Sequence, residues 1–271
     1  MPEMLIGDVN LHYEIHGSGD PLLMIMGLGS SSASWHPQLI ADLARDFRVI
    51  VYDNRGTGQS DKPDIPYSLQ MFMNDAAGLL DALKIERVHA FGVSMGGMIA
   101  QEFALNHGAR LKTLTLGCTT AGGKHAVAPP PESMKLLSAP RDGLSDADLI
   151  RRSWQLGYTQ AYMHNHRDEL EASIPRILAH PTPAFAYKRH LEATYTLKTY
   201  DRLPRITTPT LVITGVQDAL IPARNAEIIA ERIPGAKLHL IADAGHAFFN
   251  QARAEFLEVF VPFVEAHPIG A

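Results

Sequence analysis

The sequence predicts a doubly wound α/β fold, in which helices cover both faces of a mostly parallel sheet. Short, mostly apolar runs recur along the chain, as is typical of strands that are buried on both faces. Segments with a helical spacing of apolar residues lie between these runs, so that strand and helix alternate. With 271 residues, the chain is long enough to bury a sizeable core in one large domain.

An N-terminal hairpin comes first, because Met4–Ile6 and the alternating run Leu11–Ile15 flank a turn-rich spacer. Further strands are expected at Leu22–Met26, Arg48–Tyr52, Val88–Val93, Leu111–Leu116, Thr210–Thr214 and Lys237–Ile241. Helices are expected at Trp35–Ala44, Ser68–Leu83, Met95–Asn106, Pro222–Ile233 and Asn250–Glu265. Pro222 lies where a first helical turn tolerates proline, and Gly108 lies where a helix ends.

Residues 119–203 interrupt this alternation. They contain helix-like segments separated by prolines and glycines, with no strand pattern. We therefore expect a helical cap, inserted into a core domain formed by residues 1–118 and 204–271, over the sheet edge where ligands bind in open α/β folds. Trp154, Tyr158 and Tyr162 are candidates for the substrate pocket, although for any one of them a place in a small core of the cap itself is the stronger interpretation.

The composition points to a small-molecule partner. The net charge is −5, and no lysine- or arginine-rich run indicates binding to nucleic acid or to an anionic membrane. The single cysteine, Cys118, cannot form an intramolecular disulfide and is expected to be buried packing. No signal-peptide pattern or long apolar window is present, so a soluble, cytoplasmic protein is expected. Association into a homo-oligomer is left open.

The candidate nucleophile lies where an apolar run breaks at Gly92-Val93-Ser94-Met95-Gly96 and resumes with helical spacing. In such a strand-turn-helix, small flanking residues allow a close approach and the serine projects from the sheet edge. The following helix points free N–H groups at negative charge that develops beside the hydroxyl. Ser94 is therefore the candidate nucleophile. A glycine-rich turn used only for packing is the alternative.

A serine hydroxyl needs a neighbouring base, and the base needs an acid that orients it. His246 lies in a small-residue loop after the last predicted strand, at the edge where Ser94 emerges, and is the candidate base. Asp218 follows the preceding strand at the same edge and is the candidate acid, although it would also suit a helix cap. Asp243 and Asp53 compete with it, but the adjacent Arg55 suggests a structural ion pair for Asp53.

Attack by the serine creates an oxyanion, which backbone N–H groups stabilise. The loop that begins at Met26 directly follows a strand, and the predicted donors are the amides of Leu28 and Met95. A dinucleotide-binding loop is the rival interpretation of Gly27-Leu28-Gly29, but its fingerprint needs a third glycine where the chain has Ser32. We therefore expect no cofactor.

A possible metal motif occurs at His164-Asn165-His166-Arg167-Asp168, whose H-x-H-x-D spacing resembles that of a two-metal hydrolase loop. Such sites need further histidines from strand ends. This run lies in the helical insertion and is followed by Glu169. A solvated polar helix face is the better interpretation, and we expect no metal.

Taken together, these segments resemble the serine-dependent members of the α/β-hydrolase superfamily. The resemblance covers nearly the whole chain, in the order nucleophile, acid, histidine. The matching segments are Met26 to Gly29, Tyr52 to Ser60, Gly92 to Gly97, Gly215 to Asp218 and Ala244 to His246. The resemblance implies an eight-stranded, mostly parallel sheet with a helical cap after the sixth strand. Many relatives have histidine where this chain has Met26.

The resemblance also narrows the activity. Haloalkane dehalogenases and epoxide hydrolases of this shape use aspartate at the nucleophile position, where this chain has Ser94. The segments around Gly27 and Arg55 are similar to those of small-molecule esterases and 3-oxoadipate enol-lactonases, while C–C bond hydrolases and cofactor-free haloperoxidases share the triad. The expected activity is hydrolysis of a carboxylic ester through a Ser-His-Asp triad and an acyl-enzyme, with lactone hydrolysis second.

Two alternatives to ester hydrolysis are a lactonase that binds a dicarboxylate and a non-catalytic ligand-binding protein. A lactonase that binds a dicarboxylate would need cations near the pocket, and the cap offers Arg151, Arg152, Arg167, Arg176 and Arg189. Arginines on helices usually face solvent, so ester hydrolysis is preferred. A non-catalytic, ligand-binding member of the fold is the alternative of another class. The presence of all three triad residue types argues against it.

Overall fold

The computed structural model describes residues 3–137, 139 and 143–270, so residues 1, 2 and 271 of the predicted core lie outside the described part. The described strands form one eight-stranded sheet in the order β1-β2-β4-β3-β5-β6-β7-β8. The strands are β1 (Glu3–Ile6), β2 (Val9–His16), β3 (Asp20–Ile25), β4 (Phe47–Tyr52), β5 (Val88–Val93), β6 (Leu111–Gly117), β7 (Thr210–Gly215) and β8 (Lys237–Ile241). The predicted α/β fold is confirmed.

Strand direction divides the sheet into two parts. β1 pairs with β2, and β2 with β4, in antiparallel register. From β4 to β8 every neighbouring pair is parallel. The chain segments that leave β3, β5, β6, β7 and β8 therefore emerge at one edge, which is where the sequence places the candidate catalytic residues.

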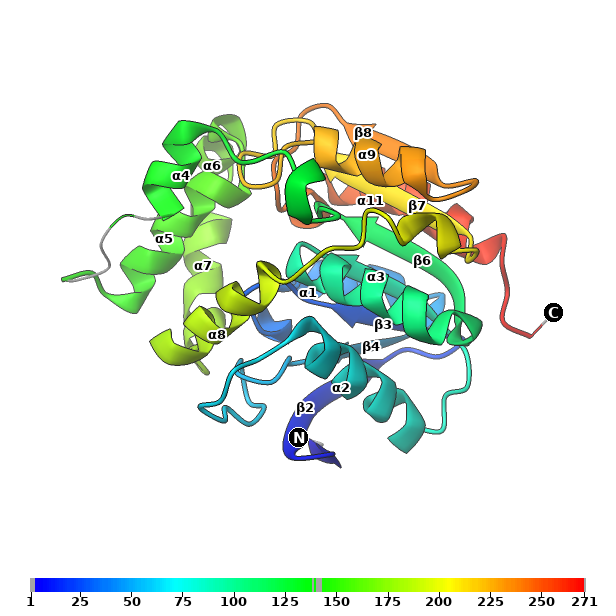
Figure 1. Ribbon diagram of the computed structural model, residues 1–271. Helices are drawn as coiled ribbons and strands as arrows, with labels where there is room; N and C mark the ends of the chain where they lie inside the picture. Colours follow the sequence, from blue (N-terminus) through cyan, green and yellow to red (C-terminus); the bar gives the residue numbers. More distant parts are fainter. Residues whose placement is uncertain (1–2, 138, 140–142, 271) are drawn as a thin grey trace.

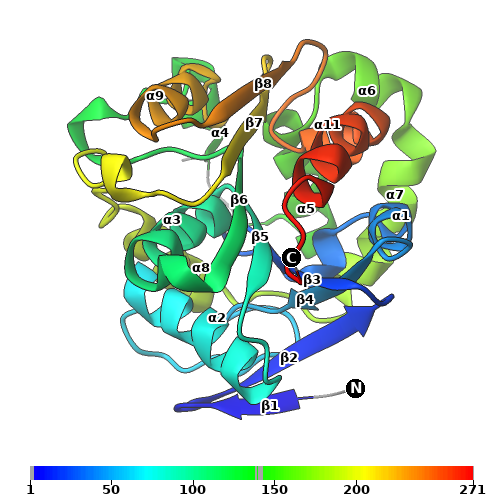
Figure 2. The same cartoon turned by 90° about the vertical axis from the view of Figure 1, so that its right-hand side faces the viewer.

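Helices cover both faces of the sheet (Figure 2). One face carries α1 (Pro37–Leu43) and α11 (Arg253–Glu265), and the other carries α2 (Leu69–Ala82), α3 (Met95–His107) and α9 (Arg224–Arg232). Alternate residues of β3 serve the two cores, because Leu22 and Met24 pack with Phe256 whereas Leu23 packs with Phe72. Burial on both faces explains why these strands are apolar throughout.

Three predicted helices differ in their limits, and the one expected from Trp35 begins at Pro37. The helix expected from Pro222 begins at Arg224. The helix expected over 250–265 is divided, because Ala252 has φ −114° and ψ 45°, which ends α10 (Phe248–Gln251) before α11 begins. The short helix α10 therefore lies between the candidate base, His246, and α11.

Residues 119–203 are here called the insertion, of which 138 and 140–142 lie outside the described part. Its described residues lie between β6 and β7 and form a group of helices at one end of the sheet (Figure 1). The helices are α4 (Pro131–Leu137), α5 (Asp146–Gly157), α6 (Gln160–Asn165), α7 (Arg167–Leu178) and α8 (Ala184–Thr194). A capping box between Ser145 and Asp148 starts α5. Trp154, Leu170 and Ile174 form a small apolar cluster between α5 and α7. Within the described ranges, no helix has the length and apolar character needed to cross a membrane.

Candidate active site

Ser94 occupies a strained turn between β5 and α3. Its backbone angles are φ 57° and ψ −120°, a conformation that residues with a side chain rarely adopt. Its amide donates to the Gly117 carbonyl oxygen at 2.9 Å, and its own carbonyl oxygen accepts from the Thr119 hydroxyl at 2.8 Å. Glycine is required at position 96, because a β-carbon there would lie 2.0 Å from the Ile25 carbonyl oxygen. Neighbouring strands thus hold the turn in place.

His246 and Asp218 meet at the same edge of the sheet. His246 Nδ1 lies 2.7 Å from Asp218 Oδ2. The other carboxylate oxygen, Oδ1, accepts from the amides of Leu220 at 2.8 Å and Ile221 at 2.7 Å. The Asp218 side chain is fully buried, so the carboxylate is fixed by hydrogen bonds and faces the imidazole. This arrangement holds the proton on Nδ1 and leaves Nε2 free to accept one.

The charge of Asp218 determines the basicity of His246. Burial lowers the pKa of His246, whereas the neighbouring carboxylate raises it, and the net pKa is well above its ordinary value. Cys118 lies beside this ring, and burial raises the pKa of its thiol. The expectation that Cys118 is buried packing is confirmed, with the addition that it packs against the candidate base.

A cavity of about 720 Å³ lies between the sheet edge and the insertion. Ser94 and His246 line it from the core, and Trp154 and Tyr158 line it from α5 and its end. Tyr162, the third aromatic residue expected at the pocket, is not among the residues that line the cavity. It stacks against Tyr158, with ring centroids 5.2 Å apart, and against His166, at 4.1 Å.

The loop that follows β3, residues 26–31, borders this cavity and lies against Ser94. A β-carbon on Gly27 would lie 3.1 Å from the Ser94 β-carbon. Among the described residues, the Leu28 amide has no hydrogen-bond acceptor. Met95 is the first residue of α3, where an amide has no acceptor within the helix. Both predicted oxyanion donors line the cavity.

Comparison with known proteins assigns the family. The family model of the α/β hydrolase fold matches residues 20–252. The chain belongs to the α/β-hydrolase fold family. This α/β hydrolase is 31% identical over 265 residues to a protein of Azorhizobium caulinodans that is provisionally named carbamate hydrolase RutD, with 97% of this chain and 98% of the other covered.

A second relative and a solved structure are named for substrates other than a carbamate. This α/β hydrolase is 32% identical over 248 residues to a poly(3-hydroxyalkanoate) depolymerase of Ectopseudomonas oleovorans, with 90% of this chain and 84% of the other covered. It also resembles the crystal structure of the enol-lactonase from Burkholderia xenovorans LB400, with a TM-score of 0.84 and 28% identity over 97% of this chain and 100% of that one.

Asp53 and Arg55 do not form the ion pair that their proximity suggested, so that expectation is wrong. Arg55 instead pairs with Asp75, on α2, at 2.7 Å. The Asp53 carboxylate accepts hydrogen bonds from the backbone amides of Ser32 at 2.7 Å and Gln59 at 2.8 Å. Because its oxygens face these amides, Asp53 holds the residue that follows the loop after β3 and plays no part in orienting His246.

His190 is a residue of this region that the sequence did not single out. It lies on α8 of this α/β hydrolase, is fully buried, and contacts Gly29 and Arg55. A single histidine in a helical segment carries no signal of such contacts, because both partners are more than a hundred residues away in the chain. Asn54 also holds the loop that follows β3, because its Nδ2 donates to the Met26 carbonyl oxygen at 3.1 Å.

The H-x-H-x-D run spans the junction of α6 and α7, where His166 Nδ1 lies 3.2 Å from Glu169. Across the part of the chain that the structure describes, no group of three or more His, Cys, Asp or Glu side chains is arranged to hold a metal ion.

Proposed function

We propose that this α/β hydrolase cleaves a carboxylic ester of a small to medium apolar molecule, with Ser94 as nucleophile, His246 as base and Asp218 as orienting acid. One observation carries the proposal. A buried Asp218–His246 pair, 2.7 Å apart, and a serine on a strained turn belong to the wall of one cavity. A purely structural histidine would not need a fully buried carboxylate aimed at it from the end of another strand.

The proposed reaction has two halves. Ser94 Oγ attacks the ester carbonyl carbon while His246 Nε2 takes the hydroxyl proton, and the carbonyl oxygen becomes an oxyanion. The amides of Leu28 and Met95 stabilise that charge, and residues 26–31 are therefore named the oxyanion loop. His246 then protonates the leaving alcohol, which leaves an acyl group on Ser94. Water, deprotonated by His246, releases the acid and restores the serine.

The insertion acts as the cap in this proposal. Its helices supply most of the cavity wall opposite Ser94, including Leu149, Trp154 and Ile177. These side chains are apolar, which favours an apolar acyl or alcohol group, because burying such a group removes it from water.

The names of the relatives support hydrolysis at a carbonyl group without agreeing on the substrate, since they specify a carbamate, a polyester and an enol-lactone. The testing experiment measures steady-state hydrolysis of short p-nitrophenyl esters, lactones and carbamates by the purified protein. Ester hydrolysis with the highest kcat/KM is expected. Binding of these compounds without turnover of any would contradict the proposal and favour a non-catalytic ligand-binding role.

The pH dependence of kcat/KM is expected to follow His246. A histidine base acts only when neutral, and the Asp218 carboxylate raises the pKa of His246 above its ordinary value of about 6.5. For a neutral ester, kcat/KM should therefore be low in acid and rise with pH through an apparent pKa above 6.5. A profile that is flat between about pH 5 and 9, with chemistry rate-limiting, would exclude a histidine base.

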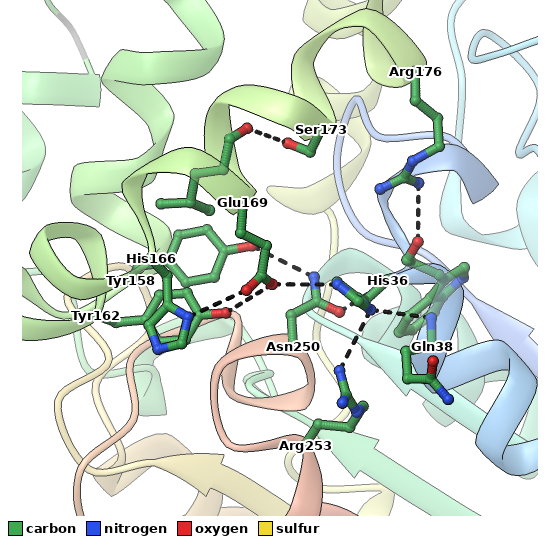
Figure 3. A network of polar contacts seen from close by, with 12 residues as sticks. His36, Gln38, Tyr158, Tyr162, His166, Glu169, Ser173, Arg176, Asn250 and Arg253 are labelled. Carbon is green, nitrogen blue, oxygen red and sulfur yellow. Dashed lines mark hydrogen bonds and ion pairs between the residues drawn. The ribbon is translucent and has the colours of Figure 1, made fainter.

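Hydrolysis of a lactone or ester that carries a carboxylate is the second candidate, and Arg176 favours it. Of the five cap arginines considered from the sequence, Arg176 lines the large cavity. Its side chain and its polar contact are drawn in Figure 3. Its guanidinium donates to the Trp35 carbonyl oxygen at 3.0 Å, and no described carboxylate pairs with it. Glu169, the nearby acidic residue, contacts His36 and His166 instead. Burial lowers the pKa of the Arg176 guanidinium, as expected for a cation without a counter-charge.

Arg176→Met tests this candidate. The substitution keeps an unbranched side chain about as long as the aliphatic part of arginine and removes the charged guanidinium. A hydrogen bond to a charged group contributes about 1.5 to 3 kcal/mol, so KM for a carboxylate-bearing ester should rise roughly 10- to 100-fold while KM for a neutral ester of the same size changes little. Arg151→Met is the matched control, because Arg151 pairs with Glu171 at 2.8 Å and does not line this cavity. Equal effects on both esters would reject a carboxylate subsite.

A further inference from the structure

His190 connects the insertion to the core through two hydrogen bonds, one that it accepts and one that it donates. The Gly29 amide donates to His190 Nδ1 at 3.3 Å. His190 Nε2 donates to the Arg55 carbonyl oxygen at 2.7 Å. The first partner lies in the oxyanion loop and the second in the segment after β4, so one ring from α8 fixes two separate loops of the core.

These partners determine the protonation state of the ring. A backbone amide only donates and a carbonyl oxygen only accepts, so His190 must be neutral, with its proton on Nε2. The environment agrees, because burial lowers the pKa of His190 to about 4. Tyr67 and Phe72 pack edge-on against the ring, with centroids 5.7 Å and 4.9 Å away. His190 is therefore well placed to orient a loop and poorly placed to exchange protons with a substrate.

The contact lies next to the amide that matters for catalysis. Leu28 lies between Gly27, which packs against Ser94, and Gly29, which is held by His190. Gly29 has φ +66°, and a β-carbon there would lie 2.5 Å from the ring of Tyr187, also on α8. The rotation of the Leu28–Gly29 peptide, and with it the backbone course at Leu28, is thus constrained from the insertion.

Among the described residues, side chains of the core hydrogen-bond the backbone at the start of the oxyanion loop and at Ser32, directly after its end. Asn54 holds the Met26 carbonyl oxygen, and Asp53 holds the amide of Ser32. Neither contact reaches the middle of the loop. Within the loop, the Ser30 hydroxyl donates to the Leu28 carbonyl oxygen at 3.5 Å, and from outside the loop His190 accepts from the Gly29 amide.

We propose that His190 is a positioning residue for ester hydrolysis, which holds Gly29 so that the neighbouring Leu28 amide points at the developing oxyanion. The proposal rests on the proposed function, since it assumes that Leu28 is an oxyanion donor. It adds that the oxyanion hole is complete only when α8 is seated on the core. The cap then contributes to the rate of the chemical step as well as to the shape of the pocket.

A pair of substitutions separates the two hydrogen bonds of His190. In His190→Asn the side-chain oxygen lies about as far from the backbone as Nδ1 of histidine and can accept from the Gly29 amide, but the donor to the Arg55 carbonyl oxygen is lost. In His190→Gln the side-chain nitrogen lies about as far from the backbone as Nε2 of histidine and can donate to the Arg55 carbonyl oxygen, but the acceptor for the Gly29 amide is lost. Both variants replace one buried ring by an amide, so a loss of stability alone should affect them similarly.

The expected result is a difference in kcat. A displacement of a catalytic group by about 1 Å can cost 10²-fold, so kcat of His190→Gln should fall about 10- to 100-fold with KM within a few-fold of wild type. His190→Asn should retain kcat within a few-fold of wild type. The affinity for an alkyl boronic acid, whose serine adduct mimics the oxyanion, should fall in parallel with kcat in the glutamine variant. The affinity for the ester's carboxylic acid product should not change.

Three measurements keep the possible failures apart. Labelling of Ser94 by an organophosphonate in the wild type shows whether the proposed function stands. If Ser94 is labelled but the two variants have equal kcat and equal affinity for the boronic acid, the positioning role is overturned. Hydrogen exchange of the Gly29 amide, read by NMR, needs no activity. It should be faster in His190→Gln than in His190→Asn, and equal rates would also overturn the proposal.

Discussion

Ser94→Ala should fold like the wild type and lose about 10³-fold or more in kcat for a p-nitrophenyl ester. Alanine keeps the β-carbon, so the strain at φ 57° is unchanged and the backbone contacts of Ser94 with Gly117 and Thr119 remain. The variant loses only the hydroxyl oxygen that would form the acyl-enzyme. Stopped-flow or steady-state release of p-nitrophenol, with a thermal melt alongside, gives the measurement.

Ser153→Ala is the matched control for this loss. Ser153 also lines the cavity, but its hydroxyl donates to the Ile150 carbonyl oxygen of its own helix at 2.6 Å. Its removal should leave kcat within a few-fold of wild type. Turnover by Ser94→Ala at the wild-type rate, in protein that melts normally, would show that another group is the nucleophile.

Asp218→Asn should lower kcat by about 10⁴-fold, the scale observed when a triad acid becomes an amide. The amides of Leu220 and Ile221 require an oxygen acceptor, so the asparagine oxygen stays with them and its NH₂ group faces His246. Nδ1 must then accept, and the proton moves to Nε2, where it blocks proton transfer from Ser94. The carboxylate that raises the pKa of His246 is also lost, so the apparent pKa of the residual activity should fall.

Asp243→Asn is the control for the choice of acid. Asp243 lies in the same segment as His246, but its side chain is exposed and makes no described contact with the imidazole. Its activity should remain close to that of the wild type. An inactive Asp243→Asn beside an active Asp218→Asn would mean that the acid has been assigned to the wrong residue.

The fold is predictable from the sequence because its strands are buried on both faces. Leu22 and Leu23, on opposite faces of β3, both have to be apolar, and this uniform pattern marks each parallel strand. Helix limits are less well defined by the same pattern. The break at Ala252 depends on a local backbone turn and lies within a run whose apolar spacing continues on both sides.

For the site, residues that follow strands are predictable, because parallel strands deliver the segments after them to one edge of the sheet. This placed Ser94, Asp218 and His246 together. Contacts that depend on how the insertion packs are not predictable in this way. His190 contacts Gly29, which lies 161 positions away in the sequence. Tyr162 stacks against Tyr158 and does not line the cavity, although both tyrosines were candidates for the pocket. The role of every site residue in catalysis stays a prediction.

Mass-spectrometric mapping of a serine-directed organophosphonate tests the central claim most directly. Covalent attack on phosphorus needs an activated hydroxyl, so the reagent reports the nucleophile and its base together. The triad assignment predicts one adduct per chain, on Ser94, and strongly slowed labelling in Asp218→Asn. An adduct on any other residue, or unlabelled Ser94 in protein that hydrolyses esters, would contradict it.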